Sequence, residues 1–415
     1  MRFRAPRGTH DILPADFPLW ERILDAADEV CALYAYRPIQ TPGFEETELF
    51  VRTSGAGSDI VRKEMYTFED LGGRRLTLRP EATAPICRAY VEHGMHREPQ
   101  PVKLYTVAAT YRYDTPQRGR YREHRQLSVE AIGSADAAVD AELIRLYVDL
   151  LRRLSVGEYT IELNSIGDRT CRPAYIERLR GWLADHDAEL DDDTREKAAR
   201  SPLRVFDTKN PRVAAALADA PKIGESLCGE CQQHFAAVRG YLDVYDVDYA
   251  LVPTLVRGLD YYTRTTFEFK STALGAQDAL AGGGRYDYLV EEIGGPPTPG
   301  IGFGAGIERL VIALQEAGAD ARPARLDVFF VCDSDGLRSD VLRAMRDLRA
   351  AGISADTDYA ARSFNGQIKL ASRLNPRITA IAAGPAVEIR RKGQRDFNIS
   401  IYKPDFVERV HAALA

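Results

Sequence analysis

Arginine side chains gather in one short part of this sequence, and arginine is well suited to hold phosphate groups. Five arginines fall within residues 112–126, "RYDTPQRGRYREHRQ", although the 415-residue chain carries a formal net charge of −6. General affinity for nucleic acid would require a basic surface. The sequence therefore predicts a local anion site in a mildly acidic protein.

Polar side chains continue along the next segment, "RQLSVEAIG", with the period of a β-strand. Gln126, Ser128 and Glu130 share one face of this strand, and the apolar residues between them share the other. The preceding segment "LYTVAATYRY" is predicted to pair with it antiparallel, which brings Arg112 close to the polar face. Such a face can accept a cation beside a ligand, and a solvated hairpin is the alternative interpretation.

A carboxylate stands at the predicted start of a helix. The segment "LTLRPEATAPICRA" places Glu81 and Thr83 after a strand-like run and a proline, and the helix is predicted to run to about residue 92. Glu81 can receive an ammonium group there, or it can be a first-turn residue favoured by the helix dipole.

The segment "RGLDYYTRTTFEF", residues 257–269, opens with Arg257, Tyr261 and Tyr262 directly ahead of a predicted strand. The strand alternates with the period of a half-buried surface. Its buried face is predicted to hold Thr265, Phe267 and Phe269, and its other face Arg264, Thr266 and Glu268.

Two glycine-rich segments follow, residues 280–289 and 299–314. The second reads strand, glycine turn and helix, with Arg309 early in an otherwise apolar helix. Neither segment has the dinucleotide fingerprint or a Walker loop. A buried arginine usually has an anionic partner, because burying it unpaired is costly.

The six cysteines are too scattered for a disulfide framework. Cys228, Cys231 and His234, in "LCGECQQHF", have the close spacing of zinc ligands. A closed zinc site needs a fourth ligand, and none is visible in the sequence. One side of an amphipathic helix is the simpler interpretation, so no metal site is predicted.

The chain is long enough for two or three domains. Residues 1–320 are predicted to form an α+β domain with a mostly antiparallel sheet, interrupted by a helical insertion at about 168–240. A connector at 316–326 leads to a small α/β domain, 325–415, with a largely parallel sheet. No run is long enough to span a membrane, and the start lacks the apolar core of a signal peptide, so a cytoplasmic protein is expected.

Taken in order, these segments resemble the histidyl-tRNA synthetase family of class II aminoacyl-tRNA synthetases. "TPGFEE" resembles the class II motif 1 dimer segment, "TYRYDTPQRGRYREHRQLSVEAIG" motif 2, and "GIGFGAGIERL" motif 3. "RGLDYYTRTTFEF" and "AGGGRYDYL" are similar to the two histidine-specific signatures, and "LRPEATA" and "SPLRVFDTK" to further family landmarks.

The resemblance implies an antiparallel sheet flanked by helices, a helical insertion, a C-terminal α/β anticodon-binding domain and a homodimer. It also implies a reaction in which L-histidine and ATP, taken as its Mg²⁺ complex, form histidyl-adenylate and pyrophosphate. The histidyl group then passes to the 3′ end of tRNA(His). No tightly bound cofactor is expected.

The resemblance assigns roles by position. The histidine-binding residues would be Glu81, Thr83 and Gln126 at the α-ammonium, and Glu130, Tyr262 and Tyr286 around the imidazole, with Tyr261 helping to shape the histidine pocket. The catalytic arginines, Arg112 and Arg257, would contact the α-phosphate and also the bound histidine. The ATP site would comprise Arg112, Arg120, His124 and Arg309. Arg120 would lie near the outer phosphates, Arg309 would take the γ-phosphate and lie against the adenine, and His124 would stack on the adenine.

Thr115 stands where many bacterial members of the family have an arginine that contacts the tRNA acceptor end. The sequence therefore leaves the acceptor-end identity rules open. Two other functions also remain as alternatives. One is a non-catalytic paralogue that serves as regulatory subunit of ATP phosphoribosyltransferase, although such paralogues typically lack the phosphate-binding arginines and the C-terminal domain. The other is an unrelated ATP-dependent ligase.

Overall fold

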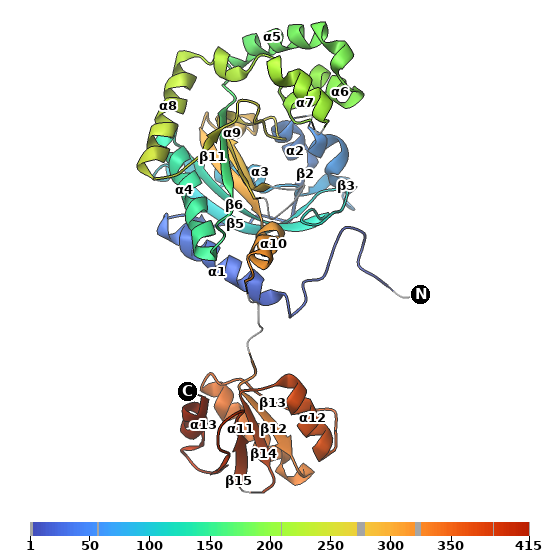
Figure 1. The fold of residues 1–415 in the computed structure, drawn as a ribbon, viewed down its shortest axis with the longest axis vertical. Coiled ribbons are helices and arrows are strands. Elements are labelled where there is room, and N and C mark those ends of the chain that lie inside the picture. Colours follow the sequence, from blue (N-terminus) through green and yellow to red (C-terminus); the bar gives the residue numbers. More distant parts are fainter. Residues whose placement is uncertain are drawn as a thin grey trace. The chain divides into compact units, whose positions relative to one another are not determined.

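The computed structural model describes residues 3–55, 58–208, 210–271, 279–319, 325–384 and 386–414. The chain divides into two compact units, Met1–Ala321 and Arg322–Ala415 (Figure 1).

The large unit is built on an eight-stranded sheet in the order β1-β5-β6-β11-β10-β9-β7-β8. All neighbouring pairs are antiparallel except the two at the edges, β1 with β5 and β7 with β8. The predicted antiparallel sheet is thus confirmed. The strands are β1 Arg37–Pro38, β5 Val102–Tyr111, β6 Glu123–Ile132, β7 Thr160–Ser165, β8 Ala250–Leu251, β9 Thr263–Lys270, β10 Ala279–Arg285 and β11 Gly300–Gly306.

Helices α1 (Phe17–Leu33), α4 (Ala137–Leu154) and α10 (Ile307–Glu316) cover one face of this sheet (Figure 1). The main core lies between them and includes Leu127, Val129 and Ala131 of β6 together with Phe267 and Phe269 of β9. These are the apolar faces that alternation predicted for both strands. The polar residues of β6 therefore point to the opposite face, which carries the site.

Two further helices, α3 (Thr83–Glu92) and α9 (Leu289–Glu292), contribute to a second apolar cluster that also contains Tyr261, Tyr262 and Tyr286. The predicted helix to residue 92 is confirmed. A three-stranded antiparallel sheet, in the order β2-β4-β3, lies N-terminal to α3 in the chain. Its elements are β2 Phe44–Glu46, β3 Tyr66–Glu69 and β4 Arg75–Leu78, with helices α2 Thr47–Ser54 and η1 Ile60–Glu64 between β2 and β3.

A helical insertion separates β7 from β8 and has an apolar core of its own. Its principal helices are α5 Arg172–Asp185, α6 Asp192–Arg200, α7 Pro211–Ala216 and α8 Gly229–Val244. The helices therefore begin a few residues after the predicted boundary at 168 and continue a few residues past 240.

A buried ion pair fixes the end of β10 to the start of α4. Arg285 and Asp140 are both fully buried, with Nη2 of Arg285 2.5 Å from Oδ1 of Asp140. Arg285 also donates to the backbone carbonyls of Ser134 and Asp136, and Thr265 of β9 donates to Asp140. The end of β10, directly before Tyr286, is therefore anchored by a hydrogen-bonded charge pair.

The small unit has a five-stranded sheet in the order β13-β12-β14-β15-β16. The strands alternate with helices as predicted, but β14, β15 and β16 pair antiparallel, so the sheet is only partly parallel. Its elements are β12 Val328–Cys332, α11 Arg338–Ala350, β13 Ala355–Thr357, α12 Phe364–Leu374, β14 Ile378–Ala382, β15 Ala386–Arg390, β16 Phe397–Ser400 and α13 Phe406–Leu414.

In the part of the chain that the structure describes, no helix combines the length and apolar character needed to span a membrane.

Candidate active site

A cavity of about 500 Å³ opens in the large unit on the polar face of the sheet. Most of the predicted site residues line it: Glu81, Thr83, Arg112, Arg120, His124, Gln126, Arg257, Tyr261, Tyr262 and Arg309. The other two, Glu130 and Tyr286, are not among the residues that line the cavity. They lie behind Thr83, to which Glu130 is hydrogen-bonded.

The carboxylate wall consists of two buried carboxylates at the start of α3: Glu81, which lines the cavity, and Glu130, which lies behind Thr83. Glu81 accepts hydrogen bonds from the backbone N–H groups of Thr83 (2.6 Å) and Ala84 (3.0 Å), at the start of that helix. The Thr83 hydroxyl donates to Oε1 of Glu130 at 2.7 Å, and the Tyr286 hydroxyl donates to Oε2 at 2.5 Å. Glu81 thus caps the backbone N–H groups at the start of α3. It could still bind an ammonium group, since carboxylate oxygens that accept these bonds keep further acceptor sites.

Burial governs the ionisation of the two carboxyl groups, Glu130 and Glu81. Desolvation raises the pKa of Glu130 to about 8, although the hydrogen bonds from Tyr286 and Thr83 oppose the change. Burial also raises the pKa of Glu81. Such carboxyl groups gain from a ligand that brings positive charge or hydrogen-bond donors, because these favour the ionised form.

Glycines in β10 and β11 make room for the site. A Cβ atom on Gly302 would overlap the Glu130 carboxylate, and one on Gly282 would overlap the Arg257 guanidinium. Both strands therefore present bare backbone where side chains of the site pass. This explains the two glycine-rich segments of the sequence better than a turn does, since β11 passes directly into α10.

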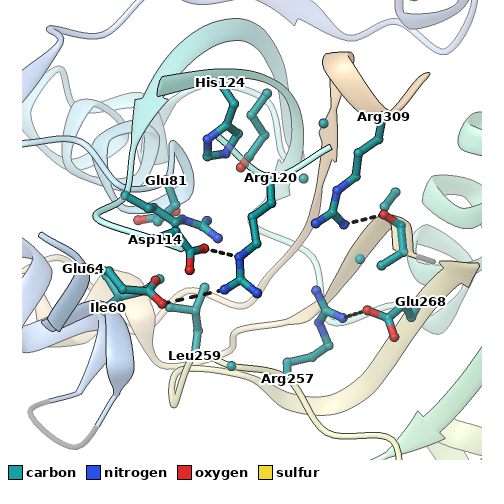
Figure 2. Close-up of a pocket in the computed structure, with 18 of the residues that line it drawn as sticks. Ile60, Glu64, Glu81, Asp114, Arg120, His124, Arg257, Leu259, Glu268 and Arg309 are labelled. Atoms are coloured by element: carbon teal, nitrogen blue, oxygen red, sulfur yellow. Dashed lines mark hydrogen bonds and ion pairs between the residues drawn. The ribbon is translucent and has the colours of Figure 1, made fainter. Parts of the chain in front are cut away.

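Five of the described arginines line the cavity: Arg112, Arg120, Arg204, Arg257 and Arg309. Figure 2 shows the side chains of Arg120, Arg257 and Arg309 converging on the same space. Arg112 donates to the Pro80 carbonyl at 2.7 Å, and Arg309 donates to the carbonyls of Gly119 (3.0 Å) and Ala279 (2.5 Å).

Burial lowers the pKa of Arg309, and the positive charges of Arg120 and Arg112 lower it further. Among the described residues no carboxylate forms an ion pair with Arg309. Arg309 is thus available to pair with an anionic ligand such as a phosphate group.

Two of these arginines do have acidic partners that sequence reasoning missed. Arg257 Nη1 lies 2.5 Å from Oε1 of Glu268, and Arg120 pairs with Asp114 and, at 3.8 Å, with Glu64 (Figure 2). Asp114 lies within the arginine-rich loop, and Glu268 shares the predicted polar face of its strand, so both could have been found. Glu64 comes from a separate short helix and left no signal.

His124 is a neutral imidazole at the edge of the arginine cluster. Burial lowers its pKa to about 3, and the positive charges of Arg112 and Arg309 contribute. Its Nε2 lies 2.9 Å from the Thr110 hydroxyl. A neutral ring can lie against an aromatic ligand without adding to the positive charge of the cavity.

The spacing of Cys228, Cys231 and His234 does not correspond to one cluster. His234 turns toward Asp140, with Nε2 and Oδ2 3.5 Å apart. The two cysteines instead meet Asp168 and Cys171, away from the cavity-lining residues.

The fold and the site together define a class II aminoacyl-tRNA synthetase. A family model described as histidyl-tRNA synthetase matches residues 8–310. A histidine–tRNA ligase of Caldanaerobacter subterraneus subsp. tengcongensis is 42% identical over 392 residues, which cover 94% of this chain and 94% of that protein.

Two solved structures extend the comparison. Apo histidyl-tRNA synthetase of S. aureus has a TM-score of 0.82 and 34% identity, over 99% of this chain and 100% of that one. A Bacillus halodurans protein described as an ATP phosphoribosyltransferase regulatory subunit/histidyl-tRNA synthetase has a TM-score of 0.64 and 25% identity, over 92% of this chain and 99% of that one. The chain belongs to the histidyl-tRNA synthetase family.

Proposed function

We propose that this chain is a histidine–tRNA ligase, which activates L-histidine with Mg-ATP and transfers the histidyl group to the 3′ end of tRNA(His). One observation carries the proposal: a cluster of arginines and the buried Glu81 line a single cavity, and the buried Glu130 lies directly behind its lining residue Thr83. The carboxylates suit the cationic and N–H groups of an amino acid, and the arginines suit a triphosphate.

Histidine would bind at the carboxylate wall. Glu81, Thr83 and Gln126 would hold its α-ammonium group, and Glu130, Tyr261, Tyr262 and Tyr286 would surround its imidazole. A neutral imidazole has one donor and one acceptor, which a carboxylate and a phenol can satisfy. An amino acid without those groups would leave the buried Glu130 and Tyr286 without hydrogen bonds from the ligand. Strong discrimination against other amino acids is therefore expected without an editing domain.

ATP would bind at the arginine cluster. A histidine carboxylate oxygen would attack the α-phosphorus in line, and the bond to the departing pyrophosphate would break. Arg112 and Arg257 would stabilise the charge on the non-bridging oxygens, while Arg120 and Arg309 would hold the outer phosphates and His124 would lie on the adenine. Mg²⁺ enters as part of the Mg-ATP substrate.

The C-terminal unit would bind the tRNA anticodon. Basic residues line a hollow of about 330 Å³ beside β15, namely Arg377, Arg390, Arg391 and Lys392. Such a cluster suits the phosphates of a single-stranded loop. Retention of this unit and of Arg112, Arg257 and Arg309 disfavours the regulatory alternative.

The active form would be a homodimer acting in the cytoplasm. The β2-β4-β3 sheet, in the segment that resembles motif 1, exposes Phe44 and Phe68, whose rings meet edge to face 6.1 Å apart. Apolar side chains left exposed side by side favour a partner surface.

The function is tested by histidine-dependent ATP–pyrophosphate exchange. We expect exchange by the unmodified chain and a loss of roughly 10²-fold or more in kcat for Arg257→Ala, with a smaller change in histidine affinity, because a transition-state contact is removed. Arg178→Ala, at a half-exposed arginine of α5, is the matched control. A chain that binds histidine but shows no exchange would instead support the regulatory alternative.

A second variant separates activation from tRNA recognition. Arg391→Ala should reduce the charging of tRNA(His) while leaving ATP–pyrophosphate exchange unchanged, because the residue lies in the C-terminal unit. Unchanged charging at subsaturating tRNA would contradict the proposed anticodon role.

A further inference from the structure

Four potential metal ligands meet at the base of the helical insertion, although they lie far apart in the sequence. Asp168, Cys171, Cys228 and Cys231 each place one ligand atom so that all four atoms lie within 4.8 Å of one another. The Sγ atoms of Cys171 and Cys231 are 3.9 Å apart. Oδ1 of Asp168 is 3.5 Å from Sγ of Cys171 and 3.9 Å from Sγ of Cys228.

These three separations are close to those around a tetrahedral zinc ion. Zn–S bonds of about 2.3 Å and Zn–O bonds of about 2.0 Å, at tetrahedral angles, place two sulfurs about 3.8 Å apart and a sulfur and an oxygen about 3.5 Å apart. A disulfide would require the sulfurs to approach to about 2.0 Å. The four side chains are therefore arranged for an ion between them rather than for a bond between two of them.

We propose that Asp168, Cys171, Cys228 and Cys231 form a closed structural site for one Zn²⁺ ion. Three thiolates and one carboxylate complete a four-coordinate shell, and sulfur-rich tetrahedral sites select zinc among the common divalent ions. Each cysteine releases its proton to solvent as its Zn–S bond forms.

The backbone around Asp168 is shaped for such a site. Gly167 adopts a φ of +65°, and a Cβ atom there would lie 2.6 Å from Sγ of Cys171. The backbone N–H of Asp168 donates to that sulfur at 3.4 Å, and the N–H of Thr170 donates to Oδ1 of Asp168 at 2.9 Å. Hydrogen bonds of this kind orient metal ligands and disperse their negative charge.

A helix N-terminus and one arginine lie beside the cluster. Cys228 is the N-cap residue of α8 and Cys231 lies in its first turn, where the helix dipole favours negative charge. Nη2 of Arg264 lies 3.5 Å from Oδ2 of Asp168, the oxygen not used in the distances above. A net negative zinc cluster would thus be compensated from outside its own ligand shell.

The site would join the two ends of the insertion. Cys171 stands at the start of α5 and Cys231 at the start of α8, sixty residues later. Arg172, the residue directly after Cys171, donates to the carbonyls of Tyr262 (2.7 Å), Gly167 (3.1 Å) and Ile166 (3.2 Å). A zinc ion would therefore hold the insertion against the backbone that carries Tyr262, which gives it a positioning role and no part in the chemistry.

The test is the metal content of the full-length chain, purified under reducing conditions without chelator. Elemental analysis should find about one zinc per chain, and exchange for Co²⁺ should give the visible spectrum of tetrahedral thiolate coordination. Cys228→Ser and Cys171→Ser should lose the metal, whereas Cys332→Ser, at a partly exposed cysteine of the C-terminal unit, should keep it.

Because a serine variant can fail to fold, Co²⁺ exchange is measured on the unmodified chain as well, together with the loss of thermal stability on chelation. The proposal is overturned if the reduced chain neither contains zinc nor takes up Co²⁺. It is equally overturned if mass spectrometry of the freshly purified chain finds a Cys171–Cys231 disulfide. These readouts do not depend on whether the chain charges tRNA.

Discussion

Glu130→Gln should stabilise the large unit and at the same time damage histidine recognition. Glu130 is fully buried, and its pKa rises from 4.5 to about 8 through desolvation. A carboxyl whose pKa is higher in the folded state holds its proton longer there than in the unfolded chain. Its contribution to stability is therefore fully present below about pH 4.5 and is lost as the pH rises toward about 8.

The size of this destabilisation follows from the interval between the ordinary pKa of 4.5 and the raised pKa of about 8. Each pKa unit corresponds to about 1.4 kcal/mol, and most of the interval has been crossed at about pH 7, so ionisable Glu130 destabilises the fold there by about 3 kcal/mol. Glutamine is neutral and similar in shape to the protonated acid. Its amide oxygen can accept from the Tyr286 hydroxyl, and its N–H group can donate to the Thr83 hydroxyl, the present partners of Glu130.

Urea unfolding measures the difference, followed by tryptophan fluorescence, because both tryptophans, Trp20 and Trp182, lie in the large unit. The variant should exceed the unmodified chain by up to about 3 kcal/mol near pH 7, and the gap should close toward about pH 5. Glu177→Gln, at a side chain that is 74% exposed, should show no such gap. A gap that does not change with pH, or a variant that is less stable at pH 7, would refute the reasoning.

The same variant should bind histidine about 10- to 100-fold more weakly, the effect of losing a hydrogen bond to a charged group. The KM for histidine in the exchange reaction measures it. A stabilised variant with an unchanged KM would remove Glu130 from the imidazole pocket while leaving the linkage argument intact.

Two other substitutions test the supports of the site. Asp140→Asn should lower the free energy of unfolding by up to about 3–5 kcal/mol, because it removes the closer of the two carboxylates that pair with buried Arg285 and leaves only Asp287; urea unfolding measures this, and a loss below about 1 kcal/mol would contradict it. Gly302→Ala should abolish histidine-dependent exchange while ATP binding, measured by calorimetry, persists, because the added methyl group would displace the Glu130 carboxylate; equal loss of both would show general damage to the cavity.

Alternation predicted the faces of the strands well because burial on one side imposes a period of two. It gave both the core and cavity faces of β6. In β9 it failed at Arg264, whose φ of +47° accompanies a break in the pairing register with β10. The strand's polar face was expected to start there, but a bulge is set by neighbouring strands and leaves no period in the sequence.

Long-range contacts were the main part of the site that the sequence could not supply. Cys228 and Cys231 were noticed together with His234 because the three are close in the chain. Their actual neighbours, Asp168 and Cys171, precede α5 and meet them only when the insertion closes on itself. The sequence also did not predict that β15 pairs antiparallel with β14 and with β16, since an apolar run has the same pattern in either chain direction.

The bare backbone of β10 and β11 restricts how this cavity can change over evolution. A pocket is usually widened by trimming a side chain, but glycine at positions 282 and 302 has none to remove. Any substitution there only fills space that Arg257 and Glu130 already use. A descendant of this protein that accepts a larger or differently shaped amino acid would therefore have to be altered elsewhere in the lining, at Thr83 of α3 or in the segment that carries Tyr261 and Tyr262.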